Sequence, residues 1–496
     1  MIAERDAKKQ LSRVIFPVIT NWMRPENCRK QSCSEGAGHK YLIQHSAGSG
    51  KTNSIAWTAH FLADLHDAND KKVFDSVLVV SDRNVIDGQL QDAIFSFERT
   101  TGVVATIKGT SGSKSAELAD ALSGQKKIVV CTIQTFPFAI EAVRELAATS
   151  GKRFAVIADE AHSSQTGEAA SKLKQVLSLE EQAELSDGGE VSMDDVLAAQ
   201  MANRASEDGI TYIAFTATPK AKTLELFGRR PKPDEPASET NLPEPFHVYS
   251  MRQAIEEEFI LDVLQNYTSY ALAFRLAHQG REFDDREVEK SKATKGLMRW
   301  VNLHPYNIAQ KVQIVVEHYR ETVAPLLDGK AKAMVVVSSR IEAVRWQLAI
   351  NKYIVEQGYP IRTLVAFSGE VKDKESGPEP FKESSSTLNP DLKGRDIREA
   401  FKGDAYQILL VANKFQTGFD QPLLCAMYID KRLSGIQAVQ TLSRLNRCYE
   451  KDGIKKDTTY VLDFIKDNRD EVLEAFKTYY TTAELDAQRI TALSWT

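Results

Sequence analysis

Short runs of apolar, mostly β-branched residues alternate with longer helical stretches along most of this 496-residue chain. In the first half the runs are VFDSVLVVSD, KKIVVCTIQ, RFAVIADEAH and ITYIAFTATP, and in the second half KAMVVVSSR, IRTLVAFSG, YQILLVANK and LLCAMYID. A strand that is apolar at nearly every position is buried on both faces, as in a parallel sheet covered by helices. The alternation therefore predicts an α/β chain with two parallel sheets.

Proline and charge are concentrated between the two groups of strands, in FGRRPKPDEPASETNLPEPF, which is typical of a linker. Two polar inserts, EEQAELSDGGEVSMDD and VKDKESGPEPFKESSSTLNPDLKG, are expected to be exposed, poorly ordered loops. The predicted organisation is a leader at 1–37, a first domain at 38–230, a linker at 231–250, a second domain at 251–475 and the start of a helical region at 476–496.

Composition narrows the class of protein. The net charge of −5 gives no overall attraction to nucleic acid, so any such binding must come from a local basic groove. The start of the chain is charged, and no apolar run reaches the length of a membrane helix. The cysteines are few, scattered and without metal-site spacing: Cys28, Cys33, Cys131, Cys425 and Cys448. These features predict a reduced, cytoplasmic protein that does not bind a membrane.

The segment HSAGSGKT carries the first sign of chemistry, because it places glycines, a lysine and a hydroxyl between a strand and a helix. Glycines let backbone N–H groups approach phosphate oxygens, Lys51 can reach the β- and γ-phosphates, and the Thr52 hydroxyl can hold Mg²⁺. The strict pattern has glycine where His45 stands, and the alternative is an ordinary glycine turn. The predicted nucleotide-binding residues are Ser46, Ala47, Gly48, Ser49, Gly50, Lys51 and Thr52.

Two adjacent carboxylates follow the apolar run FAVIA, and they strengthen the nucleotide hypothesis. Asp159 is suited to Mg²⁺, which prefers oxygen ligands, and Glu160 can orient and deprotonate an attacking water molecule. The alternative is a solvated acidic pair at a strand end. After a phosphate loop and on a buried strand of its own, the pair is better explained as a catalytic site with ATP and Mg²⁺.

In this order, the segments GSGKT, DEAH, TATP, QTGFD and QTLSRLNR resemble the motif set of superfamily-two helicases and translocases, over about Tyr41 to Phe464. The resemblance implies two RecA-like domains in tandem with an ATP cleft between them. It also implies that Gly418 and Asp420 belong to a switch beside the nucleotide. The residues it assigns to coupling hydrolysis with DNA contact are His162, Thr216 and Thr218.

The last of these motifs, QTLSRLNR, contributes Gln440, Arg444 and Arg447, with Ser443 and Asn446 where glycines are usual. By the resemblance, Arg444 and Arg447 reach across the cleft to the γ-phosphate. Guanidinium suits this task because it is a fixed charge with planar donors. Taken alone, the motif is better explained by surface arginines on an amphipathic helix.

Longer phrases give a narrower match, among them DEAHSSQTG, YSMRQAIEEEFILDVLQNYT, VANKFQTGFDQPLL and AVQTLSRLNR. They closely resemble the motor subunit of type I restriction endonucleases. That family implies ATP-driven translocation along double-stranded DNA. It also implies two partners, a methyltransferase subunit and a specificity subunit that recognises the DNA sequence. The alternatives are another superfamily-two enzyme, such as an RNA helicase or remodeller, and a remnant that only binds DNA or partner subunits.

Further polar residues follow predicted strands and are of the types that track a DNA backbone without reading sequence. They are Ser81 and Arg83 in SDRNVIDGQL, Thr132 and Gln134 in CTIQTF, and Ser338, Ser339 and Arg340 in VVSSR. The alternative for each is a helix cap or a solvated loop end.

Two departures from the family concern the N-terminal part of the chain. Only about forty residues precede the phosphate loop, too few for the family's nuclease domain, so the chain is expected to be a motor fragment. The family's adenine-reading glutamine is also missing. Inserting one cytosine into a codon series for PVITNWM restores the phrase PRYHQLD, which suggests that Val18 to about Ser34 is out of frame. Sequencing the gene tests this hypothesis.

Overall fold

The protein is described by a computed structural model. It describes residues 2–5, 11–15, 36–67, 69–81, 86–96, 102–107, 120–122, 126–132, 136–159, 162–163, 191–192, 209–219, 221–236, 238, 241–269, 303–415, 419–465 and 468–480. The chain divides into two compact units. The first comprises Met1–Leu179 and Val191–Ala254, and the second comprises Glu180–Glu190 and Ile255–Thr496. The hypothesis of an out-of-frame stretch from Val18 to Ser34 concerns residues outside the described part.

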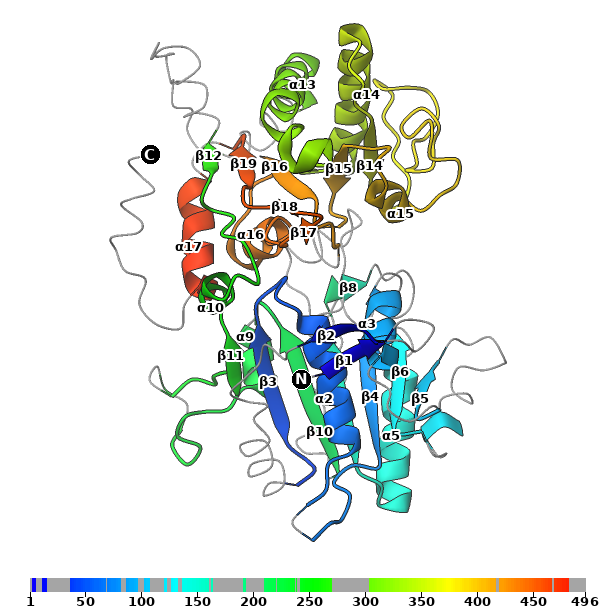
Figure 1. Ribbon diagram of the computed structural model, residues 1–496, viewed down its shortest axis with the longest axis vertical. Coiled ribbons are helices and arrows are strands. Elements are labelled where there is room, and N and C mark those ends of the chain that lie inside the picture. The colour runs from blue at the N-terminus through cyan, green and yellow to red at the C-terminus, as the bar shows by residue number, and fades with distance from the viewer. Residues whose placement is uncertain are drawn as a thin grey trace. The chain divides into compact units, whose positions relative to one another are not determined.

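The first unit is built on a seven-stranded sheet in the order β11-β3-β10-β7-β4-β6-β5, and all neighbouring strands are parallel (Figure 1). Four of these strands, β4, β6, β7 and β10, lie in the apolar runs that predicted them. The strands are β3 Lys40–His45, β4 Ser76–Ser81, β5 Val104–Thr106, β6 Ile128–Thr132, β7 Phe154–Asp159, β10 Ile210–Thr216 and β11 His247–Tyr249.

The helices of the first unit are α2 Lys51–Ala63, α3 Ile86–Ser96, α5 Phe136–Ser150 and α9 Ala221–Phe227. The helix α2 buries Ile55, Ala59 and Leu62 in the core of the first sheet. Their spacing of four and three residues places them on one helical face. This packing fixes the first turn of α2, and with it Lys51, against the sheet. Two short antiparallel pairs are β1 Ile2–Arg5 with β2 Leu11–Ile15, and β8 His162–Ser163 with β9 Val191–Ser192.

The second unit is built on a six-stranded parallel sheet in the order β12-β19-β16-β13-β15-β14. Its strands are β12 Tyr267–Ser269, β13 Lys332–Val337, β14 Thr363–Ala366, β15 Ile408–Ala412, β16 Leu424–Asp430 and β19 Tyr460–Asp463. Its helices are α13 Pro305–His318, α14 Arg340–Gln357, α15 Ile397–Lys402, α16 Gly435–Leu442 and α17 Arg469–Tyr480, and β17 Glu450–Lys451 pairs with β18 Ile454–Lys455 in a hairpin. The predicted fold class, two parallel α/β domains, is confirmed.

The second polar insert, residues 371–394, differs from the expectation of a poorly ordered loop. Arg345 of α14 donates two hydrogen bonds to Asp373, at 2.8 and 2.9 Å. The side-chain amide of Asn389 accepts from the N–H of Val365 and donates to its carbonyl, both at 2.9 Å. Because β14 is an edge strand, Asn389 satisfies backbone groups that no further strand pairs. The few apolar side chains of the insert are buried: Val371, Phe381, Leu388 and Leu392. The first insert, at 180–195, lies almost entirely outside the described residues.

The segment 231–250, predicted as a linker, contributes a strand to the first sheet. β11 lies beside β3 in parallel, with Tyr249 opposite His45. The helix α10, Met251–Glu256, follows directly. No helix in the described part of the chain combines the length and the apolar character that a bilayer crossing requires.

Candidate functional site

The phosphate loop predicted from the sequence connects β3 to α2. Gly48 and Gly50 have φ values of 90° and 92°, which other residue types rarely adopt. Gly50 is the N-cap residue of α2 and, as a glycine, offers no side-chain hydrogen bond to the N–H groups of the first turn. A loop of this kind at a helix N-terminus suits an anion, because the N–H groups and the helix dipole both favour negative charge. The residues present therefore fit the triphosphate of a nucleotide.

His45 occupies the position where the strict motif has glycine, and its environment explains how a large residue is accommodated. The ring is fully buried, with Nδ1 3.1 Å from Ser49 Oγ and Nε2 3.2 Å from Ser54 Oγ. It also packs on the ring of Tyr249, at 5.1 Å between centroids. Burial lowers the pKa of His45 to about 3, so the ring is neutral. The N–H of Ser46 donates to the carbonyl of Tyr249 at 3.0 Å, which holds the loop to β11.

Lys51 and Asp159, which the sequence analysis assigned to the phosphates and to Mg²⁺, lie together in the structure. Lys51 Nζ is 3.2 Å from Asp159 Oδ1, and the Asp159 side chain is only 3% exposed. The carboxyl ends of β3, β10 and β7 lie side by side in the sheet, so the residues that follow these strands share one edge. Thr52 is the next residue of α2. Mg²⁺ is usually bound by one or two protein groups together with substrate phosphates, so Thr52 and Asp159 are suitable ligands.

β10, between β3 and β7, ends in the TAT segment that the resemblance assigns to coupling. Thr216 and Thr218 are both buried, and the Thr218 N–H donates to Thr216 Oγ1 at 3.2 Å. The backbone of His162 pairs with Ser192 in β8–β9, while its side chain lies outside the described part. Glu160, the predicted base, is also outside the described residues.

The predicted arginines of the second unit lie beyond the end of α16, which finishes at Leu442. Arg447 Nε donates to Asp420 Oδ1 at 2.8 Å, and Arg444 Nη1 donates to the carbonyl of Phe419 at 3.0 Å. The alternative of arginines along an amphipathic helix therefore does not describe them. Gln440 lies in α16 itself. The structure brings Asp420 and Arg447 together, whereas Gly418 is outside the described residues.

The predicted DNA-contact residues have different surroundings. Ser81 and Thr132 are opposite each other at the ends of β4 and β6, although their side chains are outside the described part, as are Arg83 and Gln134. In the second unit the Ser338 hydroxyl donates to the carbonyl of Asp430 at 2.9 Å.

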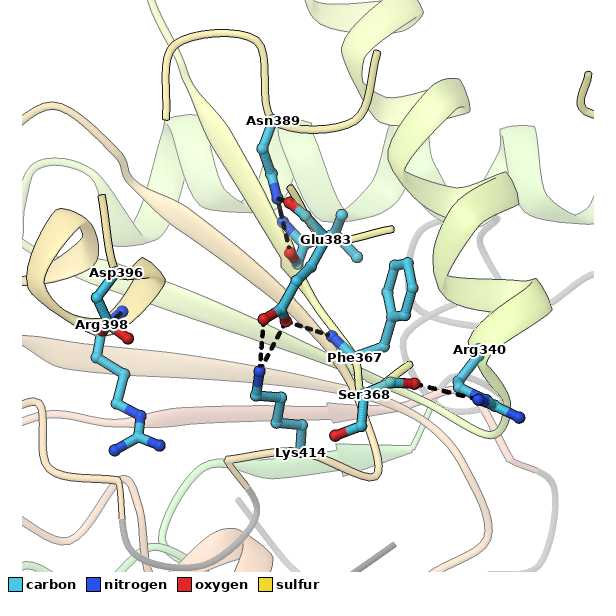
Figure 2. Close-up of polar contacts among 9 residues, drawn as sticks. Arg340, Phe367, Ser368, Glu383, Asn389, Asp396, Arg398 and Lys414 are labelled. Carbon is cyan, nitrogen blue, oxygen red and sulfur yellow. Dashed lines mark hydrogen bonds and ion pairs between the residues drawn. The ribbon is translucent and has the colours of Figure 1, made fainter. Parts of the chain in front are cut away.

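Arg340, the remaining DNA candidate, donates to the carbonyl of Ser368 at 3.1 Å (Figure 2). Its neighbour Ser339 caps α14 by accepting from the N–H of Glu342 at 3.3 Å. The helix-cap alternative thus accounts for Ser339.

Glu342 gives a testable pH dependence in this region. Its carboxylate accepts from the Ser338 N–H at 2.9 Å, and burial together with nearby Asp430 raises its pKa from 4.5 to about 7. A carboxyl group with a raised pKa in the folded state lowers stability as pH rises from about 4.5 to 7. At pH 8 we expect Glu342→Gln to have a free energy of unfolding up to about 3 kcal/mol higher than the unaltered protein, and so a higher melting temperature. Near pH 4.5 the two proteins should match. Melting curves at both pH values test this; an equal difference at both would contradict it.

Comparison with known proteins identifies the chain. Residues 26–296, more than half of it, match the family model described as SWI2/SNF2 ATPase. The chain belongs to the SWI2/SNF2 ATPase family. Residues 378–466 of this SWI2/SNF2 ATPase match domain 3 of type I restriction enzyme subunit R. This second match contains Asp420, Arg444 and Arg447.

Curated relatives confirm the resemblance to type I restriction subunits. The chain is 23% identical over 422 residues to the type I restriction enzyme HindI endonuclease subunit of Haemophilus influenzae, covering 82% of this ATPase and 35% of that subunit. It is 21% identical over 488 residues to the SauMSSORF170P endonuclease subunit of Staphylococcus aureus, covering 90% of this ATPase and 44% of the relative. The chain thus spans less than half the length of these curated relatives.

A solved structure shows the same fold. The ATP-dependent Type ISP restriction-modification enzyme LlaBIII, solved bound to DNA, superposes with a TM-score of 0.51 at 14% identity, covering 95% of this ATPase and 30% of that chain. At this identity the likeness concerns the fold alone.

Sequence reasoning missed the residues that hold the predicted groups in place. His45 was noted only as a departure from the motif, although a polar residue at a glycine position signals a specific environment. Asn446 likewise replaces a glycine, and its Oδ1 accepts from Arg447 Nη1 at 2.9 Å. A polar residue at a position where the motif usually has glycine was therefore the sequence signal that could have revealed these supporting contacts.

Proposed function

We propose that this chain is the ATP-driven motor of a type I restriction endonuclease and moves double-stranded DNA past the complex. The observation that carries the proposal is the pairing of Lys51 with buried Asp159 beside a glycine loop whose N-cap residue, Gly50, offers the helix no side-chain hydrogen bond. A lysine and a carboxylate in this arrangement can hold a triphosphate and its cation. The family matches of both halves of the chain support the same conclusion.

The first unit binds ATP as substrate. Backbone N–H groups of the loop after Ser46, whose own N–H donates to Tyr249, bind phosphate oxygens, and Lys51 binds the β- and γ-phosphates. Thr52 and Asp159 would hold Mg²⁺, which when bound neutralises charge on the phosphates. Glu160 orients and deprotonates the attacking water.

The second unit completes the site in this proposal. Arg444 and Arg447 stabilise the charge on the γ-phosphate, with Gln440, Gly418 and Asp420 beside them. ATP binding closes the two domains because residues of both domains hold the γ-phosphate. Hydrolysis removes this link, and the domains open. His162, Thr216 and Thr218 transmit the change to the DNA-contacting residues.

DNA is held through its backbone, so that movement does not depend on sequence. The proposed contacts are Ser81, Arg83, Thr132 and Gln134 in the first domain, and Ser338 and Arg340 in the second. Arg340 is the stronger candidate of the last two: the Ser338 hydroxyl donates its one proton to the Asp430 carbonyl, whereas Arg340 donates to Ser368 from a guanidinium group with five N–H donors. Partner methyltransferase and specificity subunits supply recognition of the DNA site.

Phosphate release by the full chain tests the proposal. We expect linear double-stranded DNA to stimulate release, with longer duplexes consuming more ATP per DNA end because the motor travels further. RNA and single-stranded DNA of equal length should stimulate less, and Lys51→Ala serves as the blank for contaminating ATPases. Stimulation by RNA above that by duplex DNA would indicate another kind of superfamily-two enzyme. Release equal to the Lys51→Ala blank would leave only a binding remnant.

A further inference from the structure

Lys456 is a buried lysine that lies against the backbone of the arginine segment, Leu445–Arg447. Its side chain is 1% exposed, and it follows the β17–β18 hairpin (Figure 1). Lys456 Nζ donates to the carbonyls of Leu445 and Arg447, at 2.7 and 3.0 Å. Removing an ammonium group from water costs several kcal/mol, and the hydrogen bonds only partly offset this cost. A buried lysine is therefore a poor choice for stability alone.

The same backbone is also held from its other side. Ile260 forms an isolated antiparallel bridge with Arg447, and the N–H of Leu261 donates to the carbonyl of Asn446 at 2.8 Å. Consecutive peptide groups of the arginine segment are thus bonded to residues 260–261 on one side and to Lys456 on the other. A backbone held from both sides has little freedom to change the direction in which Arg447 leaves it.

The charge of Lys456 strengthens these bonds. Burial lowers the pKa of Lys456 to about 8, so the ammonium form predominates at neutral pH. Hydrogen bonds from a charged donor are roughly twice as strong as neutral ones. Because the backbone of Arg447 is held in this way, its side chain extends to Asp420 from a defined position, with Nε 2.8 Å from the carboxylate.

We propose that Lys456 is a positioning residue that fixes the arginine segment so that Arg447 is presented to the γ-phosphate. Lys456 acts through Arg447 and does not touch the nucleotide. The inference rests on the proposed function, because it takes Arg447 as a γ-phosphate ligand. Stabilisation of a transition state depends on groups placed in advance, and a displacement of about 1 Å can cost about a hundredfold in rate.

Lys332 provides a matched control within the same unit. It is 2% exposed, and its Nζ donates to the carbonyls of Gly403 and Tyr406 at 2.9 and 2.5 Å. Burial lowers its pKa to about 8 as well. Its partners lie in the loop between α15 and β15, which contains none of the proposed ATP or DNA residues. Lys456→Met and Lys332→Met therefore remove the same charge and two hydrogen bonds each, and Lys332→Met also removes the contact of Lys332 Nζ with the Phe401 ring, 4.7 Å from its centroid.

The experiment compares the two variants in melting temperature and in DNA-stimulated phosphate release. We expect comparable losses of melting temperature. We expect Lys456→Met alone to lower kcat, by about ten- to a hundredfold, with little change in KM for ATP. It should also weaken binding of ADP with aluminium fluoride, a transition-state analogue, more than binding of ADP. If Lys456→Met does not fold, Lys456→Gln gives the same comparison, because its shorter side chain reaches at most one carbonyl.

A double variant separates this inference from the proposed function. In an Arg447→Ala background, Lys456→Met should cause no further loss of kcat, because the residue through which it acts is gone. A further loss there, or equal kcat for Lys456→Met and Lys332→Met, would overturn the positioning role. Wild-type kcat in Arg447→Ala alone would instead overturn the assignment of Arg447, and the positioning role with it.

Discussion

Arg447→Ala is expected to lower kcat for DNA-stimulated ATP hydrolysis by about a thousandfold while changing KM for ATP little. In the proposed mechanism the guanidinium group stabilises charge that develops on the γ-phosphate in the transition state, and arginines in this role contribute about 10³–10⁵ in rate. Its ion pair with Asp420 adds modestly to stability: Arg447 is only 18% exposed and also donates to Asn446, but the carboxylate is 38% exposed, and pairs that water reaches contribute about 1 kcal/mol. The melting temperature should therefore fall only slightly. Stopped-flow phosphate release and a melting curve test both halves of the prediction.

Arg432→Ala is the control for this variant. Arg432 also forms an ion pair on the second unit, with Glu471 of α17, and its side chain is largely exposed. It carries none of the proposed contacts with ATP or DNA, so its removal should leave kcat near that of the unaltered chain. Equal rates for the Arg447 and Arg432 variants would remove the arginine from the mechanism.

Most central strands, and the fully buried edge strand β14, were predictable from sequence, whereas the three-residue edge strands were not. β13 and β15 in the second unit are buried at every position, which is why their apolar runs marked them. In contrast β5, β11 and β12 have only three residues each, and all three lie at sheet edges. An edge strand is paired on one side only and needs no continuous apolar run. Whether such a segment forms a strand depends on the strand beside it, and the local sequence carries no information about that neighbour.

Within the site, the sequence analysis named the charged residues that the structure pairs, but not the residues that hold them in place. The proximity of Lys51 and Asp159 follows from the rule that residues after parallel strands gather at one sheet edge. The role of Lys456 could not be predicted, because its neighbour Lys455 has the same side chain and is exposed. Only the geometry of the β17–β18 hairpin decides which of the two lysines turns inward. Buried polar contacts of this kind depend on long-range packing rather than on local pattern.

Lys51→Ala should reduce ATP hydrolysis by about 10²–10³ and also destabilise the first unit. Removing one preorganised electrostatic group from a transition state typically costs this much in rate. Stability falls for a separate reason: Asp159 is 3% exposed, and without Lys51 its charge remains buried next to an uncharged side chain. Breaking a buried pair by removing one partner costs about 3–5 kcal/mol, and the partial exposure of Lys51 places the expected loss near the lower value.

Adding Asp159→Asn to Lys51→Ala separates the two effects. The amide carries no charge, so the double variant should recover most of the melting temperature lost by Lys51→Ala. It should recover no phosphate release, because it lacks both the lysine proposed to bind the γ-phosphate and the carboxylate proposed to hold Mg²⁺. Asp159→Asn alone should hydrolyse ATP poorly and still melt near the unaltered chain, since Lys51 is 17% exposed and reaches water. Recovery of hydrolysis together with stability would show that the pair only supports the fold, and that the triphosphate is bound elsewhere.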